Sequence, residues 1–150
     1  MDVRENYHDN DIENKRVYLQ LLQEPISRMS SSSAIFKGFS AAILAGLASA
    51  SFKEISIGAL FLGLLPIISF LFLDVYYLSL ERKLKYRYQM VVEDKVYVDF
   101  SINTILSKQE IKVAKSNPFI CLLSPSIWLF YVPILVCSIC LLYLKKNGVF

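Results

Sequence analysis

The sequence predicts an all-α membrane protein with three transmembrane helices, an N-terminal amphipathic helix and a small cytoplasmic segment. Of its 150 residues, 55% are hydrophobic and 19% are charged, whereas a typical soluble domain has about 45–50% apolar and about 25% charged residues. Three stretches hold no charge at all: 38–52, 55–73 and 116–144. A helix needs roughly 20 apolar residues to cross the hydrocarbon core, and a backbone in lipid must satisfy its own hydrogen bonds. Each stretch is therefore expected to form a membrane-spanning helix.

These stretches divide the chain into five predicted parts. Residues 1–31 form a cytoplasmic or interfacial amphipathic helix, and 32–74 hold the first two transmembrane helices. Residues 75–117 form a cytoplasmic extension, 118–144 the third transmembrane helix and 145–150 a short external tail. The first apolar run begins too far from the N-terminus for a signal peptide, so no cleavage is expected.

The distribution of Lys and Arg predicts the orientation in the membrane. Residues 1–37 carry five of these cations and 75–115 carry eight, while the link between the first two spans carries one and the tail carries two. Lys and Arg accumulate in cytoplasmic loops. We therefore expect the N-terminus inside and the C-terminus outside.

The first apolar run differs from the others because it is built on small residues. They recur at every fourth position: Ala34, Gly38, Ala42, Gly46 and Ala50. Such a stripe lets helices approach closely in lipid. It favours association between protomers, and the alternative is packing of an Ala-rich helix within its own protomer. Before this run, apolar residues mark one face of a short helix that Asn10 or Asp11 can cap, and Pro25 is expected to end or kink that helix.

The second apolar run is expected to continue as a helix past Asp74, and Pro66 is tolerated within it as a kink. The extension carries an apolar stripe (Leu80, Leu84, Tyr88 and Val91) that needs a partner helix, from the same or another protomer. Alternation at 96–103 then suggests an extended strand. Ser107 followed by Glu110 predicts a capping box at the start of a short helix. The third span is bulky and aromatic, as expected for a lipid-facing outer helix.

No catalytic set is visible, so the chain is not expected to be an enzyme, and no cofactor or metal is expected. His8 is the lone histidine and lies in the polar N-terminus. Cys137 and Cys140 have C-x-x-C spacing, but they lie in apolar sequence without further zinc ligands. Together with Cys121 they are expected to be small packing residues.

Two ionisable residues lie at the edges of the first two spans, and each has two interpretations. Asp74 is either an interfacial carboxylate that pairs with Arg82 or a nearby lysine, or part of a charged ring at a pore mouth. Lys37 either snorkels to the interface, or faces a water-filled axis with serines that include Ser33 and Ser40. Ser33, Lys37, Ser40 and Asp74 are thus the candidate pore or gate residues.

A basic cluster follows the second span: Arg82, Lys83, Lys85 and Arg87. One interpretation is a topology determinant that touches anionic lipid. The other is a site for an anionic signal, such as a nucleotide or an oligonucleotide, coupled to the second span.

Three segments resemble blocks of small multi-span bacterial proteins that occur with antiphage defence genes: SRMSSSSAIFKGFSAA (27–42), FLDVYYLSLERKLKYRYQ (72–89) and SPSIWLFYVP (124–133). These proteins include SLATT-like membrane effectors, and the membrane effector of the Hailong system is a candidate closer relative. The resemblance covers roughly residues 12–144. It implies an oligomeric inner-membrane channel, closed until a nucleotide-type signal changes, whose opening depolarises the infected cell. It also implies that Arg28 and Lys37 flank the start of the first span, and that Asp74 with Arg82 marks the end of the second.

The sequence thus leaves two functional hypotheses. The first is a homo-oligomeric ion channel or pore-forming effector in the lipid bilayer, gated from the cytoplasm by an anionic signal. The alternative is a non-conducting membrane anchor or structural subunit that recruits a cytosolic partner protein through residues 75–115.

Overall fold

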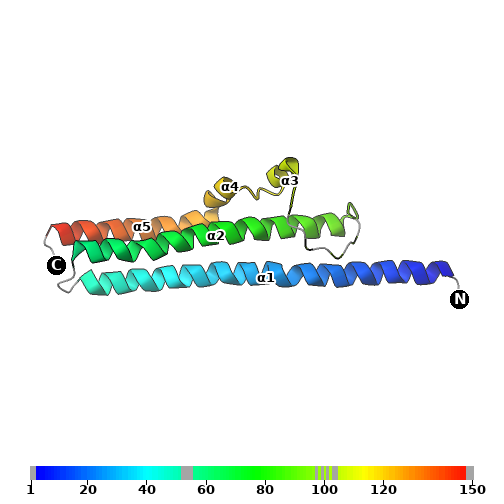
Figure 1. The fold of residues 1–150 in the computed structure, drawn as a ribbon, viewed down its shortest axis with the longest axis horizontal. Coiled ribbons are helices and arrows are strands. Elements are labelled where there is room, and N and C mark those ends of the chain that lie inside the picture. Colours follow the sequence, from blue (N-terminus) through cyan, green and yellow to red (C-terminus); the bar gives the residue numbers. More distant parts are fainter. Residues whose placement is uncertain are drawn as a thin grey trace.

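A computed structural model describes residues 3–51, 56–96, 98, 100, 102 and 105–147, with the side chains of all of these except 3–10, 50, 51, 59 and 60. It contains five helices in this part of the chain: α1 (Val3–Ser51), α2 (Ile57–Val92), α3 (Lys108–Val113), α4 (Pro118–Leu122) and α5 (Pro125–Lys146). The long helices α1, α2 and α5 lie side by side, and α3 and α4 form a small layer beside α2 (Figure 1).

Three helical stretches are long and apolar enough to cross a membrane, at 11–49, 61–92 and 108–146. The all-α fold with three candidate spans is therefore confirmed. The described residues of the 96–103 segment, at 96, 98, 100 and 102, belong to no strand. The other residues of that predicted strand lie outside the described part of the chain.

The helix α1 is a single unbroken rod, which corrects two predictions. It begins at Val3, upstream of the predicted cap at Asn10 or Asp11, and it continues through Pro25. The 1–31 segment is therefore not a separate helix from the first span. Proline removes one backbone donor and clashes with the preceding turn, but both halves of α1 pack against α2 and hold the helix together across that site.

The first half of α1 covers the extension of α2. Tyr18 and Leu22 are fully buried against Leu84 and Val91, at most 1% exposed. The predicted stripe on α2 therefore has its partner helix, and that helix is α1 of the same chain. At about 1.5 Å per residue, α1 is about 74 Å long and α2 about 54 Å, so both outreach a hydrocarbon core of about 30 Å. The first half of α1 and the extension of α2 thus form a stalk of two paired helices. It lies at the end opposite the connection between α1 and α2.

The segment that precedes α5 is more divided than the sequence predicted. Ser107 accepts a hydrogen bond from the Glu110 backbone, and the Glu110 side chain accepts one from the Ser107 backbone, so the predicted capping box starts α3. The predicted third helix over 118–144 is two helices, because α4 ends at Leu122 and α5 starts at Pro125. Arg82 of α2 bridges this region by donating hydrogen bonds to the Lys115 carbonyl (2.7 Å) and to Ser124 Oγ (2.9 Å).

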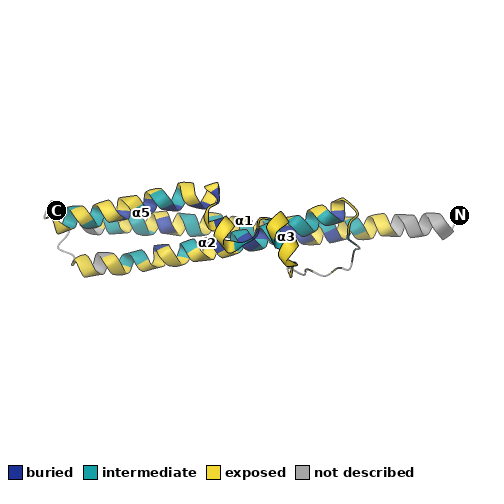
Figure 2. Ribbon diagram, turned by 90° about the horizontal axis from the view of Figure 1, so that it is seen from above, coloured by how far each residue is buried: buried dark blue, intermediate teal, exposed yellow. Residues whose placement is uncertain are grey.

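Burial follows the seams between the long helices, and the outward faces are exposed (Figure 2). On α5, Leu129 is 69% exposed and Ile139 is 62% exposed. Large apolar side chains at this exposure require an apolar environment. The bilayer is the environment that fits both these faces and the lengths of the helices.

Candidate functional site: a polar cluster between three helices

A charged pair joins α1 to α2 beside the start of α5. Lys37 Nζ lies 3.3 Å from Asp74 Oδ2. The same ammonium donates hydrogen bonds to Ser33 Oγ at 2.9 Å and to Ser126 Oγ at 3.0 Å. One α1 side chain thus contacts all three long helices. Ionisable residues within membrane spans are rare, pair with one another and mark functional positions.

The acid of this pair is buried more completely than the base. Asp74 is 0% exposed, while the side chain of Lys37 keeps 19% of its surface. Neither Asp74 carboxylate oxygen has a hydrogen bond of acceptable geometry, and the cation that faces the carboxylate is Lys37. A buried carboxylate in this position depends strongly on its cation, because removal of one partner of a buried pair leaves an uncompensated charge.

Two further polar groups complete the cluster. Ser40 is fully buried and its hydroxyl donates to the Phe36 carbonyl, one turn earlier in α1. Tyr131 of α5 is 2% exposed, and its hydroxyl is buried without a hydrogen bond. Tyr131 packs in the same buried cluster as Val75, the residue that follows Asp74 in α2. The cluster therefore contains unsatisfied buried oxygens from two helices, which native proteins keep to a few per domain.

All four candidate pore or gate residues are brought together here, at a place that the sequence did not predict. Ser33, Lys37, Ser40 and Asp74 gather between the helices of one protomer. Asp74 pairs with Lys37 and not with Arg82, and Lys37 points to a carboxylate and does not snorkel. The residues that sequence reasoning missed are Ser126 and Tyr131, since no local pattern in α5 distinguishes a residue that faces α1 and α2 from one that faces lipid.

The small-residue stripe occupies a different face of α1. Ala34, Gly38, Ala42 and Gly46 are exposed, and the side chain of Ala50 lies outside the described residues. A Cβ added at Gly38 or at Gly46 would meet no heavy atom within 4 Å. The stripe therefore does not serve packing within the protomer over its described length.

The basic cluster on α2 does not converge on one site. Successive helical residues turn by about 100°, and the four cations accordingly have separate surroundings. Arg82 binds the link before α5, Lys85 pairs with Glu81, and Arg87 Nε donates to the Tyr18 hydroxyl at 3.4 Å. Lys83 is half-buried.

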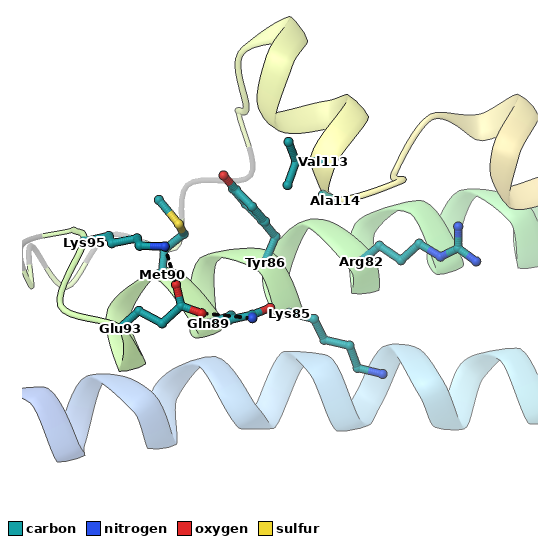
Figure 3. Close-up of a pocket in the computed structure, with 9 residues that line it drawn as sticks. All are labelled: Arg82, Lys85, Tyr86, Gln89, Met90, Glu93, Lys95, Val113 and Ala114. Carbon is teal, nitrogen blue, oxygen red and sulfur yellow. Dashed lines mark hydrogen bonds and ion pairs between the residues drawn. The ribbon is translucent and has the colours of Figure 1, made fainter.

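A cavity of about 440 Å³ lies between α2 and α3, next to this cluster. Tyr86 and Val113 face each other across it, while Lys85 points toward α1 and Arg82 points away from the Glu93 end (Figure 3). At that end Lys95 is paired with Glu93 at 2.6 Å. The hydrogen bond from Lys95 lowers the pKa of Glu93, and the same contact raises the pKa of Lys95. The cations around the cavity are thus already engaged by groups of the chain itself.

No group of three or more His, Cys, Asp or Glu residues with metal-site geometry occurs among the described residues. Cys121 is buried and Cys137 and Cys140 are exposed, all as free thiols. A scan of protein-family models, a search of curated proteins and a search of solved structures found no match to this chain.

Proposed function

We propose that this chain is one protomer of a homo-oligomeric membrane channel, in which the α1 helices of neighbouring copies pack through the small-residue stripe. The observation that carries the proposal is the open space at Gly38 and Gly46, where an added Cβ would meet no atom within 4 Å apart from its chain neighbours and the backbone of its own helix. Small residues in membrane helices support close backbone approach between helices. Copies in one membrane share one orientation, so their α1 helices are parallel and their stripes lie at the same depth.

Several copies are needed because three helices of one protomer enclose no lumen. The charged residues of the membrane helices are compensated inside the protomer, between Lys37 and Asp74. A ring of α1 helices would then present small, uncharged side chains such as Ala45 and Ser49 to its axis, since both are exposed. A narrow lumen of this kind excludes water and is closed, because apolar constrictions gate channels by dewetting.

The resemblance to antiphage membrane effectors supports the physiological part of the proposal. On this view the protein resides in the inner membrane with its N-terminus in the cytoplasm, and opening of the channel depolarises an infected cell. The stalk of α1 and α2, with the cavity beside α3, is the part available to a cytoplasmic anionic signal such as a nucleotide or an oligonucleotide. Such a ligand has to displace Glu93 from Lys95 to gain that cation.

The test compares two variants that place leucine on two different exposed membrane faces. Gly38→Leu with Gly46→Leu fills the stripe on α1. Ser69→Leu is the control, because Ser69 is exposed on α2 and bonds only to its own helix at the Leu65 carbonyl. The mass of the purified protein in detergent and its conductance in planar bilayers are the measurements.

We expect the wild-type chain and Ser69→Leu to form oligomers that are closed at rest and open in brief conducting events. We expect the double glycine variant to be monomeric and to show no such events. A monomeric wild-type chain, or an oligomer that survives the double substitution, would overturn the packing through α1. An oligomer of defined mass that never conducts would overturn the channel and favour the membrane anchor that recruits a cytosolic partner.

A further inference from the structure

The short helix α4 turns apolar side chains outward on most of its surface. Phe119 is 79% exposed, and Leu123, at the C-terminal cap of the helix, is 76% exposed. Cys121 is the one buried side chain of α4, and it packs in a cluster with side chains of α2 and α5. A concentration of large exposed apolar side chains marks a surface that binds a partner or a membrane.

Hydrogen bonds from one turn of α2 fix the orientation of α4. Arg82 donates to the Lys115 carbonyl at 2.7 Å and to Ser124 Oγ at 2.9 Å. Ser79 Oγ donates to the Ser116 carbonyl at 2.6 Å. The chain is thus tied to α2 on both sides of α4, and the exposure of the apolar side chains of α4 is a property of the fold.

The length of α5 places α4 at the edge of the hydrocarbon core. The 22 residues of α5 extend about 33 Å at about 1.5 Å per residue, close to the thickness of that core, about 30 Å. Lys145 and Lys146 in the last turn of α5 fit one membrane interface, so its first residue, Pro125, lies at the other. Only two residues separate α4 from α5, and exposed apolar side chains continue on α5 with Trp128.

The helix α3, in the same layer beside α2 (Figure 1), carries exposed cations. They are Lys108, Lys112 and Lys115, and the i,i+4 spacing places the first two on one face of the helix. Within the described residues no ion pair joins any of the three to a carboxylate. A cation at the first residue of a helix opposes the helix dipole, so Lys108 does not serve the stability of α3.

Lys115 lies at a backbone position that glycine usually occupies. Its φ is 48°, and its N–H donates to the Lys112 carbonyl while the N–H of Ser116 donates to the Ile111 carbonyl. This is the Schellman pattern that ends a helix, in which a residue with a side chain is strained. A lysine is therefore present at a position where local stability favours glycine.

We propose that residues 108–123, the interfacial segment, dock on the membrane surface in the leaflet on the stalk side. Phe119 and Leu123 enter the boundary between headgroups and acyl chains, as the apolar face of an interfacial helix does. The three lysines bind the phosphate groups of anionic lipids, because cations beside a span attract negatively charged headgroups. Lipid fits this surface because the apolar side chains continue into the lipid-facing surface of α5 and the neighbouring charges are positive.

This docking is separate from the other functional features of the chain. None of the three lysines lines the cavity between α2 and α3. The docking also requires neither an oligomer nor a conducting channel, so its test is independent of the test of the channel. On this proposal residues 108–117 of the expected cytoplasmic extension lie against the membrane.

Quenching of a single tryptophan in the full chain, reconstituted in vesicles, tests the depth of α4. The chain holds one tryptophan, so Trp128→Phe gives a background in which Phe119→Trp reports on α4. Val17→Trp in the same background is the control, because Val17 is exposed on α1 and lies about 30 Å along that helix from Lys37, which bonds to Ser126 at the start of α5.

Lipids brominated on their acyl chains should quench Phe119→Trp, and aqueous acrylamide should quench it only weakly. Val17→Trp should show the reverse. Strong quenching of Phe119→Trp by acrylamide would overturn the docking. Protection from both quenchers would also overturn it, because the helix would then be covered by protein, such as a second copy of the chain.

Energy transfer from the Phe119→Trp chain to lipids with an acyl-chain acceptor tests the lysines. In phosphatidylcholine vesicles, trace labelled phosphatidylglycerol should accept more transfer than trace labelled phosphatidylcholine. Lys112→Gln with Lys115→Gln should lower this preference by about fivefold for each lysine. Lys15→Gln with Arg16→Gln removes the same charge from the stalk and should leave the preference unchanged. Equal transfer to both lipids, or a preference that survives the loss of both α3 lysines, would overturn the proposal.

Discussion

Gly63 is the point at which α1 and α2 approach most tightly among the glycines of the described chain. A Cβ built there would lie 2.3 Å from Leu47 Cδ2, 3.2 Å from Cγ and 3.3 Å from Cδ1. Two carbons prefer a separation of about 3.5–4.0 Å. Rotation of the terminal methyl groups of Leu47 relieves the shortest contact but leaves Cγ at 3.2 Å. Gly63→Ala therefore also requires Leu47 Cγ to shift by a few tenths of an ångström.

Such overpacking is expected to lower the free energy of unfolding by about 1–3 kcal/mol, partly offset by the helix propensity of alanine, about 1 kcal/mol better than that of glycine. Gly58→Ala is the matched control in the same helix, because the nearest atom to its added Cβ is Ser56 Oγ at 4.0 Å. This control variant should be as stable as the wild-type chain or more stable. The measurement is unfolding of the purified chain in mixed micelles, followed by far-UV circular dichroism.

A second substitution assigns the effect to the contact itself. Leu47→Ala by itself destabilises the hairpin by removing a packed side chain, but it also makes room for a Cβ at position 63. The double variant Leu47→Ala, Gly63→Ala should therefore be more stable than the sum of the single effects, with a coupling of about 1 kcal/mol or more. Additive effects, or a Gly63→Ala chain as stable as Gly58→Ala, would refute the inferred close approach.

Three other perturbations test local interactions. Ser107→Ala removes the capping hydroxyl and should destabilise α3 by about 1 kcal/mol, seen as faster amide exchange at 108–113. The hydrogen bond from Ser107 lowers the pKa of Glu110. The stabilisation of α3 by this bond is therefore fully present above the unfolded-state pKa of Glu110, and it is lost as the pH falls through the folded-state pKa. An NMR titration should show a higher pKa for Glu110 in Ser107→Ala than in the wild-type chain. Asp94→Asn breaks an exposed pair with Lys15 and should change stability by less than about 1 kcal/mol, and a larger loss would show that this pair fixes the stalk. Arg82→Gln cannot span both of its acceptors and should expose the link before α5 to limited proteolysis, whereas an unchanged cleavage pattern would show that the two hydrogen bonds do not hold that link.

The main architecture was accessible from the sequence because it depends on local composition. The charge-free runs predict three spans, and the stripe on the second-span extension predicts a packed partner, here Tyr18 and Leu22 of α1. The capping box at Ser107 was accessible for the same reason, since both of its residues lie within one turn. The break between α4 and α5 could not be predicted from the sequence, because Pro125 is compatible both with the first turn of a helix and with a turn between helices.

The candidate site could be predicted only in part. Lys37 and Asp74 stand out because a charge at the edge of an apolar run is costly, but they lie on different helices, and the sequence suggested Arg82 or a nearby lysine as the partner of Asp74. Arg82 is instead engaged by the Lys115 carbonyl and Ser124. The role of Tyr131 depends on which side of α5 faces its neighbours, and a uniformly apolar helix contains no such information.

The sequence by itself determined how many helices are long and apolar enough to cross a membrane, and which charged residues they carry, because a bilayer demands long apolar runs whatever their neighbours are. Only the tertiary structure decided that α1 runs unbroken through Pro25, that its small-residue stripe is open, and that its polar residues turn inward to Asp74. The physical reason is that hydrophobicity is a property of each residue by itself, so an apolar run can be recognised from the sequence alone. The partner of a buried charge is instead fixed by the rotation and register of helices that pack against one another.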